Sequence, residues 1–269
     1  MSTDPFTHLV IGQAMETHRS LGPGLAEELY HRDLVARLVA GGVGYESKLR
    51  RELVYRGQVA DAFEPDIVFP RQLIVELKSL RTEFLPDHFT QLLAYQKFWA
   101  IGTGLLFDFG KASLIFKRVV FTSVVAEFPV VLVPAWAEPS GLATALVELL
   151  GQVQRDHGLG YRETTWRGLV VAALKADGVG HLLAPAVAVG RLGVANLRCI
   201  VIQSRCALTI GALGEGVSAT DRAYLQTYLR WLGLPWGIAV HFGRKAVDVR
   251  FVMAPTNRDF PQIQGTTDG

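Results

Sequence analysis

Two short apolar runs that carry acidic residues constrain this chain more than any other feature. Residues 64–69 read EPDIVF and residues 73–78 read LIVELK, with a turn-like Pro-Arg-Gln between them. This pattern predicts two neighbouring β-strands. Residues two apart on a strand share a face, so Glu76 and Lys78 point the same way, and Asp66 on the adjacent strand can lie beside Glu76.

The two carboxylates require an explanation, because they would repel each other inside apolar surroundings. At a separation of roughly 4 Å the repulsion is about 4 kcal/mol at an effective dielectric near 20. A bound divalent cation keeps both groups ionised, so a metal site at Asp66 and Glu76 is the specific hypothesis. The competing interpretation is a solvated ion pair between Glu76 and Lys78, which strand-end carboxylates often form.

Length and composition leave the partner class open. The chain has 269 residues, of which 49% are apolar and 19% charged, which suits one large domain or two of ordinary size with compact cores. The net charge of +2 is too small to indicate a strong nucleic-acid field, although positive charge can still be concentrated locally. With only Cys199 and Cys206, the sequence excludes a disulfide framework and a zinc pattern, and both cysteines are predicted to be buried thiols.

The N-terminal residues lack the basic and apolar segments of a secretory signal. The most hydrophobic stretch, residues 124–136, contains Glu127, Pro129 and Pro134, and a transmembrane helix needs about 20 apolar residues. We therefore expect a soluble cytoplasmic protein that has no membrane partner.

The periodicity along the first half predicts an α/β fold. Helices are expected over residues 7–19, 25–40 and 86–99, a hairpin over 49–55 and 59–63, and further strands over 105–109 and 114–120. This order suits a mixed central sheet flanked by helices. Glu27 and Tyr30 share one face of the second helix, and Gln91 and Tyr95 share one side of the third.

Several motifs then occur in a recognisable order. They are GLAEELY at residues 24–30, Pro65-Asp66, Glu76-Leu77-Lys78, QLLAY at residues 91–95 and GLLFDFG at residues 104–110. In this order the motifs resemble the bacterial GxxExxY family, a branch of the PD-(D/E)XK nuclease superfamily with its restriction-endonuclease-like fold. The resemblance covers residues 8–121. It implies a metal-dependent nuclease that uses Mg²⁺ or Mn²⁺ and acts on DNA or RNA.

The resemblance also implies roles for individual residues. Asp66 and Glu76 would bind the metal with the Leu77 carbonyl as a further ligand, and Lys78 would orient the attacking water or stabilise the anionic transition state. Glu27 is a candidate additional ligand, and its alternative role is that of a helix N-terminal acid that interacts with the dipole. Gln91 and Tyr95 resemble a Gln-x-x-x-Tyr element that contacts substrate phosphate or braces the strands.

The second half repeats part of this pattern. GYRETTW at residues 160–166 matches residues 24–30, and Tyr228, Gly237, Phe242 and Gly243 match Tyr95, Gly104, Phe109 and Gly110. In the same frame Asp66, Glu76, Lys78 and Gln91 correspond to Cys199, Thr209, Gly211 and Tyr224. The second half is therefore interpreted as a degenerate copy that keeps the scaffold and lacks the two-acid site. The alternative is that the matches are coincidental. Because the copy keeps Tyr228, a packing role is favoured for Tyr95, and the same reasoning applies to Tyr30, which Trp166 matches.

The predicted organisation is a nuclease-like domain over residues 1–133, a linker over 134–141, the degenerate copy over 142–255 and a polar tail over 256–269. The two copies would form a pseudo-dimer within one chain. Three function classes stay open: a metal-dependent nuclease, a catalytically silent nucleic-acid-binding or structural protein, and a hydrolase or regulator acting on another phosphate-containing ligand. The complete acid–acid–lysine set favours the first, and the lack of a basic run keeps the second open.

Overall fold

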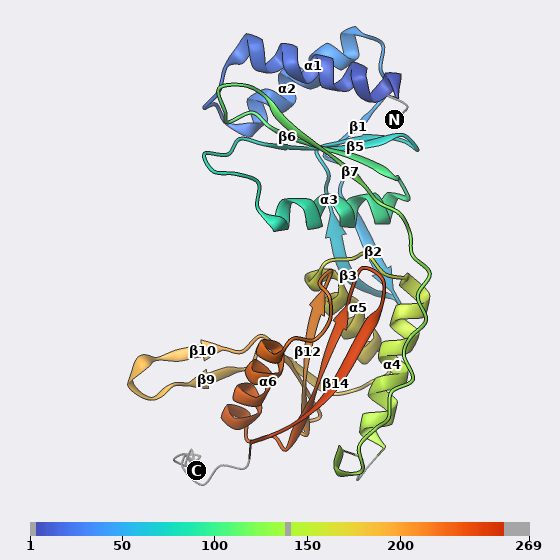
Figure 1. Ribbon diagram of the computed structural model, residues 1–269, viewed down its shortest axis with the longest axis vertical. Coiled ribbons are helices and arrows are strands. Elements are labelled where there is room, and N and C mark those ends of the chain that lie inside the picture. The colour runs from blue at the N-terminus through green and yellow to red at the C-terminus, as the bar shows by residue number, and fades with distance from the viewer. Residues whose placement is uncertain (1–3, 138–140, 256–269) are drawn as a thin grey trace.

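The computed structural model describes residues 4–137 and 141–255, which form two lobes stacked along the long axis (Figure 1). In the first lobe the elements are α1 (Pro5–Leu21), α2 (Glu27–Ala40), β1 (Glu46–Ser47), β2 (Arg51–Tyr55), β3 (Gln58–Phe63), β4 (Ile67–Phe69), β5 (Leu73–Lys78), α3 (Pro86–Trp99), β6 (Thr103–Asp108) and β7 (Ile115–Val120). The expected residues 134–141 linker contains a short 3₁₀ turn, η1 (Ala135–Ala137). Residues 138–140 and the 256–269 tail lie outside the described residues.

The second lobe repeats this order of elements. It contains α4 (Leu142–His157), α5 (Glu163–Ala176), β8 (His181–Leu183), β9 (Ala186–Ala188), the 3₁₀ turn η2 (Gly190–Leu192), β10 (Val194–Asn196), β11 (Ile200–Ile202), β12 (Cys206–Ala212), α6 (Ala219–Leu232), β13 (Trp236–Phe242) and β14 (Val247–Met253). Among the described helices none is both long and apolar enough to cross a bilayer.

Each lobe is built on a five-stranded mixed sheet. The strand orders are β1-β4-β5-β6-β7 and β8-β11-β12-β13-β14, and in each sheet only the central pair, β5 with β6 or β12 with β13, is parallel. The registers also agree, because Glu76 lies opposite Leu106 where Thr209 lies opposite Ala239, 133 residues further on. The predicted fold class, two tandem nuclease-like α/β domains, is confirmed.

Local sequence explains where several helices begin and end. The Asp4 side chain accepts hydrogen bonds from the backbone N–H groups of Phe6 and Thr7, each at 3.2 Å, and Pro5 occupies the first helical position of α1. Gly22 ends that helix with φ of 69°, a conformation that favours glycine. Ser218 and Asp221 cap α6 reciprocally through their side chains.

The first sheet is covered on both faces. Helices α1 and α2 pack on one face through Val10, Tyr30 and Leu34, which contact Leu77 and Phe107 in one buried cluster. The other face packs under α3 through Leu92 and Tyr95 (Figure 1). The Tyr30 ring stacks on Phe109 at 4.6 Å, and the Trp166 ring stacks on Phe242 at 3.8 Å in the second lobe. This geometry agrees with a packing role for both aromatic residues.

The β2–β3 hairpin forms as the sequence predicted, directly before β4. It makes a separate two-stranded sheet, and the edge strand of the central sheet is β1, which was not predicted. The hairpin reaches into the second lobe and lies against α5 (Figure 1). There the apolar side chains of Leu53, Tyr55 and Phe63 join a buried cluster with Trp166 and Leu169.

Candidate active site

The sheet brings the two predicted carboxylates onto one face. Ile67 pairs with Val75, so extending the antiparallel register by one residue sets Asp66 opposite Glu76. Glu76 shares a strand face with Ile74, which packs on the α3 side, while Val75 and Leu77 face the α1–α2 core. Both carboxylates are buried, with 9% of Asp66 and 3% of Glu76 exposed. Burial removes water from both carboxylates, so their negative charges need a counter-charge, hydrogen bonds or a ligand in its place.

Hydrogen bonds fix the orientation of both acids. Asp66 Oδ2 accepts the backbone N–H of Leu77 at 2.7 Å, which ties the end of β4 to β5. Glu76 Oε1 accepts a hydrogen bond from Lys78 Nζ at 2.7 Å. The other oxygen, Glu76 Oε2, is buried and has no hydrogen-bond partner among the described residues. An unpartnered buried oxygen is costly, so this atom is suited to receive a ligand.

Asp66, Glu76 and Lys78 lie close enough to shift one another's pKa. Burial and the neighbouring Asp66 carboxylate raise the pKa of Glu76 to about 7. Burial also raises the pKa of Asp66, against the stabilising Leu77 N–H. For Lys78, burial lowers the pKa, but the adjacent Glu76 carboxylate outweighs burial and the pKa lies above its ordinary value. The site is thus two carboxylates that repel each other beside one ammonium group.

Glu27 approaches this group from the first turn of α2. Burial raises its pKa, while Lys78 lowers it and Asp66 raises it, so the carboxylate lies within the field of the site. Among residues 4–137 and 141–255, however, no group of three or more His, Cys, Asp or Glu side chains is arranged to hold a metal ion. The geometry therefore supports a two-carboxylate site, and a metal-ligand role for Glu27 stays a prediction.

Gln91 and Tyr95 lie on the side of α3 that faces the acids. The Gln91 side-chain amide donates a hydrogen bond to the Tyr95 hydroxyl at 2.8 Å. Burial raises the pKa of Tyr95, and the Glu76 carboxylate raises it further. The ring also packs edge-on against Phe63 of the hairpin. Tyr95 therefore has both a packing contact and a hydroxyl near the acids.

Sequence reasoning missed three residues that surround the site. His31 Nε2 lies 3.2 Å from the Asp66 carbonyl and 2.8 Å from Ser47 Oγ, which anchors the start of β4 to α2. Asp108 accepts hydrogen bonds from the N–H groups of Leu80 and Gly110, each at 2.9 Å, and so holds the loop that follows Lys78. Asp108 lies within the GLLFDFG motif, and an acidic residue in this apolar run could have indicated a buried, hydrogen-bonded carboxylate.

The third missed residue comes from the other lobe. Arg162, directly before α5, lies 3.6 Å from Asp61 of the hairpin, and its Nε is buried without a hydrogen-bond partner among the described residues. Its guanidinium lowers the pKa of Tyr95, opposing burial and Glu76. Thr165 Oγ1 donates to the same Asp61 at 2.5 Å. The second lobe thus reaches the edge of the site, which no sequence pattern indicated.

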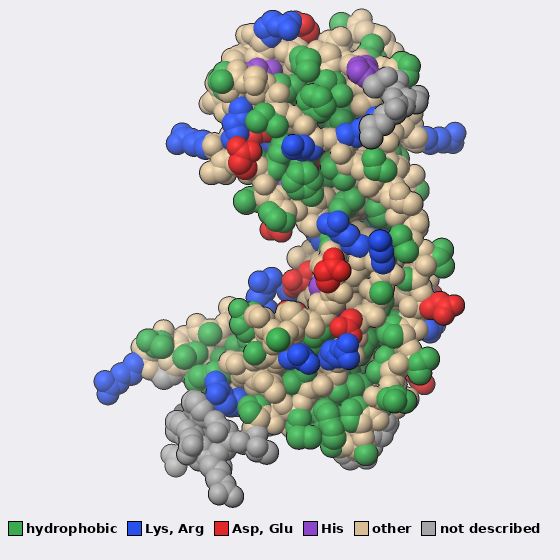
Figure 2. All heavy atoms as spheres, viewed as in Figure 1, with side chains coloured by type: hydrophobic (Ala, Val, Ile, Leu, Met, Phe, Trp, Pro, Cys, Tyr) green, Lys and Arg blue, Asp and Glu red, His purple; other side chains and the backbone are tan. Residues whose placement is uncertain are grey.

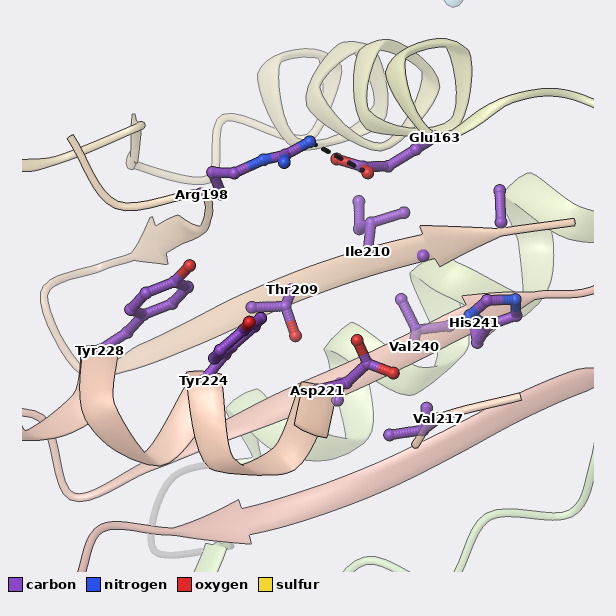
Figure 3. A pocket seen from close by; sticks show the side chains of 13 residues that line it. Glu163, Arg198, Thr209, Ile210, Val217, Asp221, Tyr224, Tyr228, Val240 and His241 are labelled. Carbon is purple, nitrogen blue, oxygen red and sulfur yellow. Dashed lines mark hydrogen bonds and ion pairs between the residues drawn. The ribbon is translucent and has the colours of Figure 1, made fainter. Parts of the chain in front are cut away.

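The corresponding position of the second lobe contains a cavity of about 340 Å³ (Figure 3). Thr209 stands at the Glu76 position of the sheet, and Tyr224 and Tyr228 project from α6 as Gln91 and Tyr95 do from α3. Glu163 forms an ion pair with Arg198 at 3.5 Å. Cys199, at the Asp66 position, is a buried free thiol, as predicted, and burial raises its pKa to about 11.

At the position that corresponds to Lys78, the second lobe has a glycine, and a histidine side chain occupies the space beside it. A Cβ on Gly211, which corresponds to Lys78, would lie 2.5 Å from His241 Nδ1, so the imidazole fills the space above this strand. His241 Nε2 accepts the N–H of Gly214 at 2.9 Å, and burial lowers the pKa of the ring. Because Nε2 accepts this hydrogen bond, a proton of the ring lies on Nδ1. Glu163 and Asp221 line this cavity, but neither stands at the sheet positions of Asp66 and Glu76, and its described lining residues include no lysine.

Comparisons with known proteins agree with the motifs of the first half. Residues 4–119 match the family model of the PD-(D/E)XK nuclease superfamily. A search of curated proteins found no match. A solved structure titled "Crystal structure of SSO0001" aligns with 44% of this chain and 78% of its own, at 15% identity and a TM-score of 0.28, which is too low to define a shared fold. The first lobe is therefore similar to the PD-(D/E)XK nuclease superfamily, and the match ends before the second lobe begins.

Proposed function

We propose that the first lobe hydrolyses phosphodiester bonds of nucleic acid at a site formed by Asp66, Glu76 and Lys78. DNA is the preferred candidate substrate, and RNA is the alternative. The observation that carries the proposal is the buried Glu76 carboxylate. One of its oxygens accepts a hydrogen bond from Lys78, and the other, near Asp66, has no hydrogen-bond partner among the described residues. A purely structural ion pair would satisfy both oxygens or expose them to water.

The donor set fits a hard divalent cation. Carboxylate and carbonyl oxygens are the ligands that Mg²⁺ and Mn²⁺ prefer, and Asp66 and Glu76 with the Leu77 carbonyl would supply them. The mutual repulsion that raises the pKa of Glu76 is removed when a cation neutralises both acids. When bound, the ion supplies Lewis acidity at the scissile phosphate.

The side chains of this chain would perform the remaining steps. Lys78 keeps two N–H donors beyond its bond to Glu76, and they suit the anionic oxygens of a phosphate. Because the Tyr95 hydroxyl accepts from Gln91, its own proton is available for donation to the substrate. Glu27 helps to hold the Lys78 ammonium in its charged form. The second lobe, which lacks the acid pair, would act as the non-catalytic half of a pseudo-dimer.

Cleavage assays test the proposal directly. Linear, nicked and single-stranded DNA, and RNA, are incubated with Mg²⁺ or Mn²⁺ and the purified full chain. We expect Asp66→Asn, Glu76→Gln and Lys78→Met each to lower the rate by at least about 100-fold. Glu83→Gln changes an exposed acid of the loop before α3 and is the matched control. Cleavage that persists in all three site variants would refute the proposal.

Metal binding gives a second readout that does not depend on activity. A ligand that binds only the folded state raises the melting temperature by mass action. Millimolar Mg²⁺ or Mn²⁺ should therefore raise the Tm of the wild type and of Glu83→Gln, and leave the Tm of Asp66→Asn unchanged. Differential scanning fluorimetry measures the shift. Equal shifts in the wild type and Asp66→Asn would place the ion elsewhere, and nucleic-acid binding without cleavage would favour the silent binding protein instead.

A further inference from the structure

A groove between the two lobes collects positive charge from both of them. It has a volume of about 540 Å³ and lies between α3, β7 and residues 121–124 of the first half, and Leu159, Gly160, Leu213 and the β13–β14 turn of the second. Its charged lining consists of Lys117, Arg118, Arg244 and Lys245. Among its described lining residues there is no Asp or Glu. Lys and Arg side chains are also seen at the narrow waist of the molecule (Figure 2).

Lys117, Arg118, Arg244 and Lys245 make no salt bridge with the described residues, although the charge of Arg118 lowers the pKa of Asp4 at the start of α1. All four cations are exposed. The whole chain has a net charge of only +2, so this concentration is a local feature. Like charges collected in a concave surface repel one another and raise the local potential. A polyanionic ligand would relieve that repulsion.

The floor of the groove is apolar and partly aromatic. Phe89 and Leu93 of α3 and Phe121 after β7 line it. The Lys97 ammonium lies 5.9 Å from the Phe121 ring centroid, which adds a fifth cation beside the floor. Basic side chains around aromatic rings suit a single strand, because its unpaired bases can stack on the rings while its phosphates meet the cations. A duplex would present only phosphates and would leave the apolar floor unused.

The groove and the candidate active site share helix α3. Gln91 and Tyr95 lie on the side of α3 near the acids, whereas Phe89 and Leu93 lie on the side toward β7. A helix with its side chains is about 10 Å across. A strand in the groove therefore lies one helix width from Glu76. This spacing suits a surface that holds a substrate beside the place where it is cut.

We propose that the groove binds a single-stranded segment of the nucleic acid on which the first lobe acts, through Lys117, Arg118, Arg244 and Lys245; this rests on the proposed nuclease function. The second lobe then contributes to substrate binding without an active site of its own. The sequence concealed the feature, because the two basic pairs are separated by more than a hundred residues and neither is a basic run.

Strand binding is measured by fluorescence anisotropy with a labelled single-stranded DNA 20-mer in EDTA, so that no cleavage occurs. Arg244→Ala/Lys245→Ala should weaken binding by at least about 10-fold at low salt and reduce the slope of log K against log salt by about 1.4, since each lost single-strand contact removes about 0.7. Arg191→Ala/Arg205→Ala removes two arginines of the second lobe outside the groove and is the matched control. Its affinity and slope should stay close to those of the wild type.

The outcomes separate this proposal from the nuclease itself. If the groove variant binds with wild-type affinity and salt slope, or if the wild type binds no single strand, the groove assignment is overturned. If the groove variant loses binding but the wild type cleaves nothing with either metal, the nuclease assignment fails and the groove assignment stands. All four residues are exposed, so the groove variant should fold as the wild type does. An unchanged thermal unfolding curve would verify this. A duplex of the same sequence, bound equally tightly, would overturn the single-strand preference.

Discussion

At the scale of single residues, burial decides which charged groups are left without a hydrogen-bond partner in the described structure. Glu76 has one unpartnered oxygen because β5 places it under α3, whereas Glu28, on the exposed side of α2, forms an ion pair with Lys48 in water. The sequence predicted Asp66, Glu76 and Lys78 as a set from alternation along a strand. It could not predict that the Arg162 charge would lower the pKa of Tyr95, because that proximity depends on how the two lobes pack.

Lys97 offers a pH test at the same scale. Its ammonium lies 4.7 Å from the Tyr161 ring centroid in the contact between the lobes, and burial lowers its pKa to about 8. Between pH 8 and its unfolded value near 10.4, the unfolded state binds more protons, so stability rises with pH across this window. Below pH 8 the charged, partly buried group destabilises the fold, although the cation–π contact offsets part of that cost.

We therefore expect Lys97→Met to stabilise the protein by about 1 kcal/mol at pH 7. The advantage over the wild type should shrink as pH rises from 8 to 10, because the wild-type lysine becomes neutral in the folded state while it stays mostly protonated in the unfolded state. Urea denaturation of both proteins at pH 7 and pH 10 measures the difference. Lys175→Met, at an exposed lysine of α5, is the control, and an advantage of Lys97→Met that does not change with pH would contradict the assignment.

At the scale of elements, the β2–β3 hairpin joins the lobes by packing against α5 and its neighbouring residues. Tyr55 donates a hydrogen bond to Asp156 of α4 at 2.6 Å, and Arg56 forms an ion pair with Asp177 at 2.9 Å. The backbones approach closely because α5 carries Gly168, where a Cβ would lie 1.8 Å from the Ala60 carbonyl oxygen. Only glycine leaves room for the neighbouring strand at this position, although alanine has the higher helix propensity.

Gly168→Ala should consequently destabilise the protein by about 1–3 kcal/mol, because the strand or the helix must move to admit the methyl group. Gly12→Ala is the matched control, since Gly12 also lies within a helix and a Cβ there would meet nothing within 4 Å. That control should stabilise the protein by up to about 1 kcal/mol. Chemical denaturation compares the two variants, and the same sign of change in both would show that the close approach is unimportant.

At the scale of the whole molecule, the two lobes share one apolar cluster. Leu53, Tyr55 and Phe63 of the hairpin are buried together with Trp166 and Leu169 of the second lobe. The sequence predicted the strands of this hairpin from their alternation and turn. It did not predict where the hairpin packs, because the partner helix lies about a hundred residues away and nothing local distinguishes one apolar surface from another.

The predicted boundary at residue 133 therefore has a measurable consequence. A fragment of residues 1–133 lacks α5, which leaves the apolar face of the hairpin exposed. We expect the fragment to self-associate at concentrations where the full chain does not. Size-exclusion chromatography with light scattering measures this, and a monomeric fragment that unfolds as cooperatively as the full chain would show that the first lobe is independent.

The placement of this hairpin also bears on how the chain folds as it leaves the ribosome. The hairpin is complete at Phe63, whereas its partner helix ends at Ala176. At a synthesis rate of about 5–20 residues per second, the nascent first lobe waits roughly 5–20 s with that apolar surface uncovered. A nascent-chain chaperone would have its main opportunity to bind in this interval, and translational pausing before α5 would prolong it.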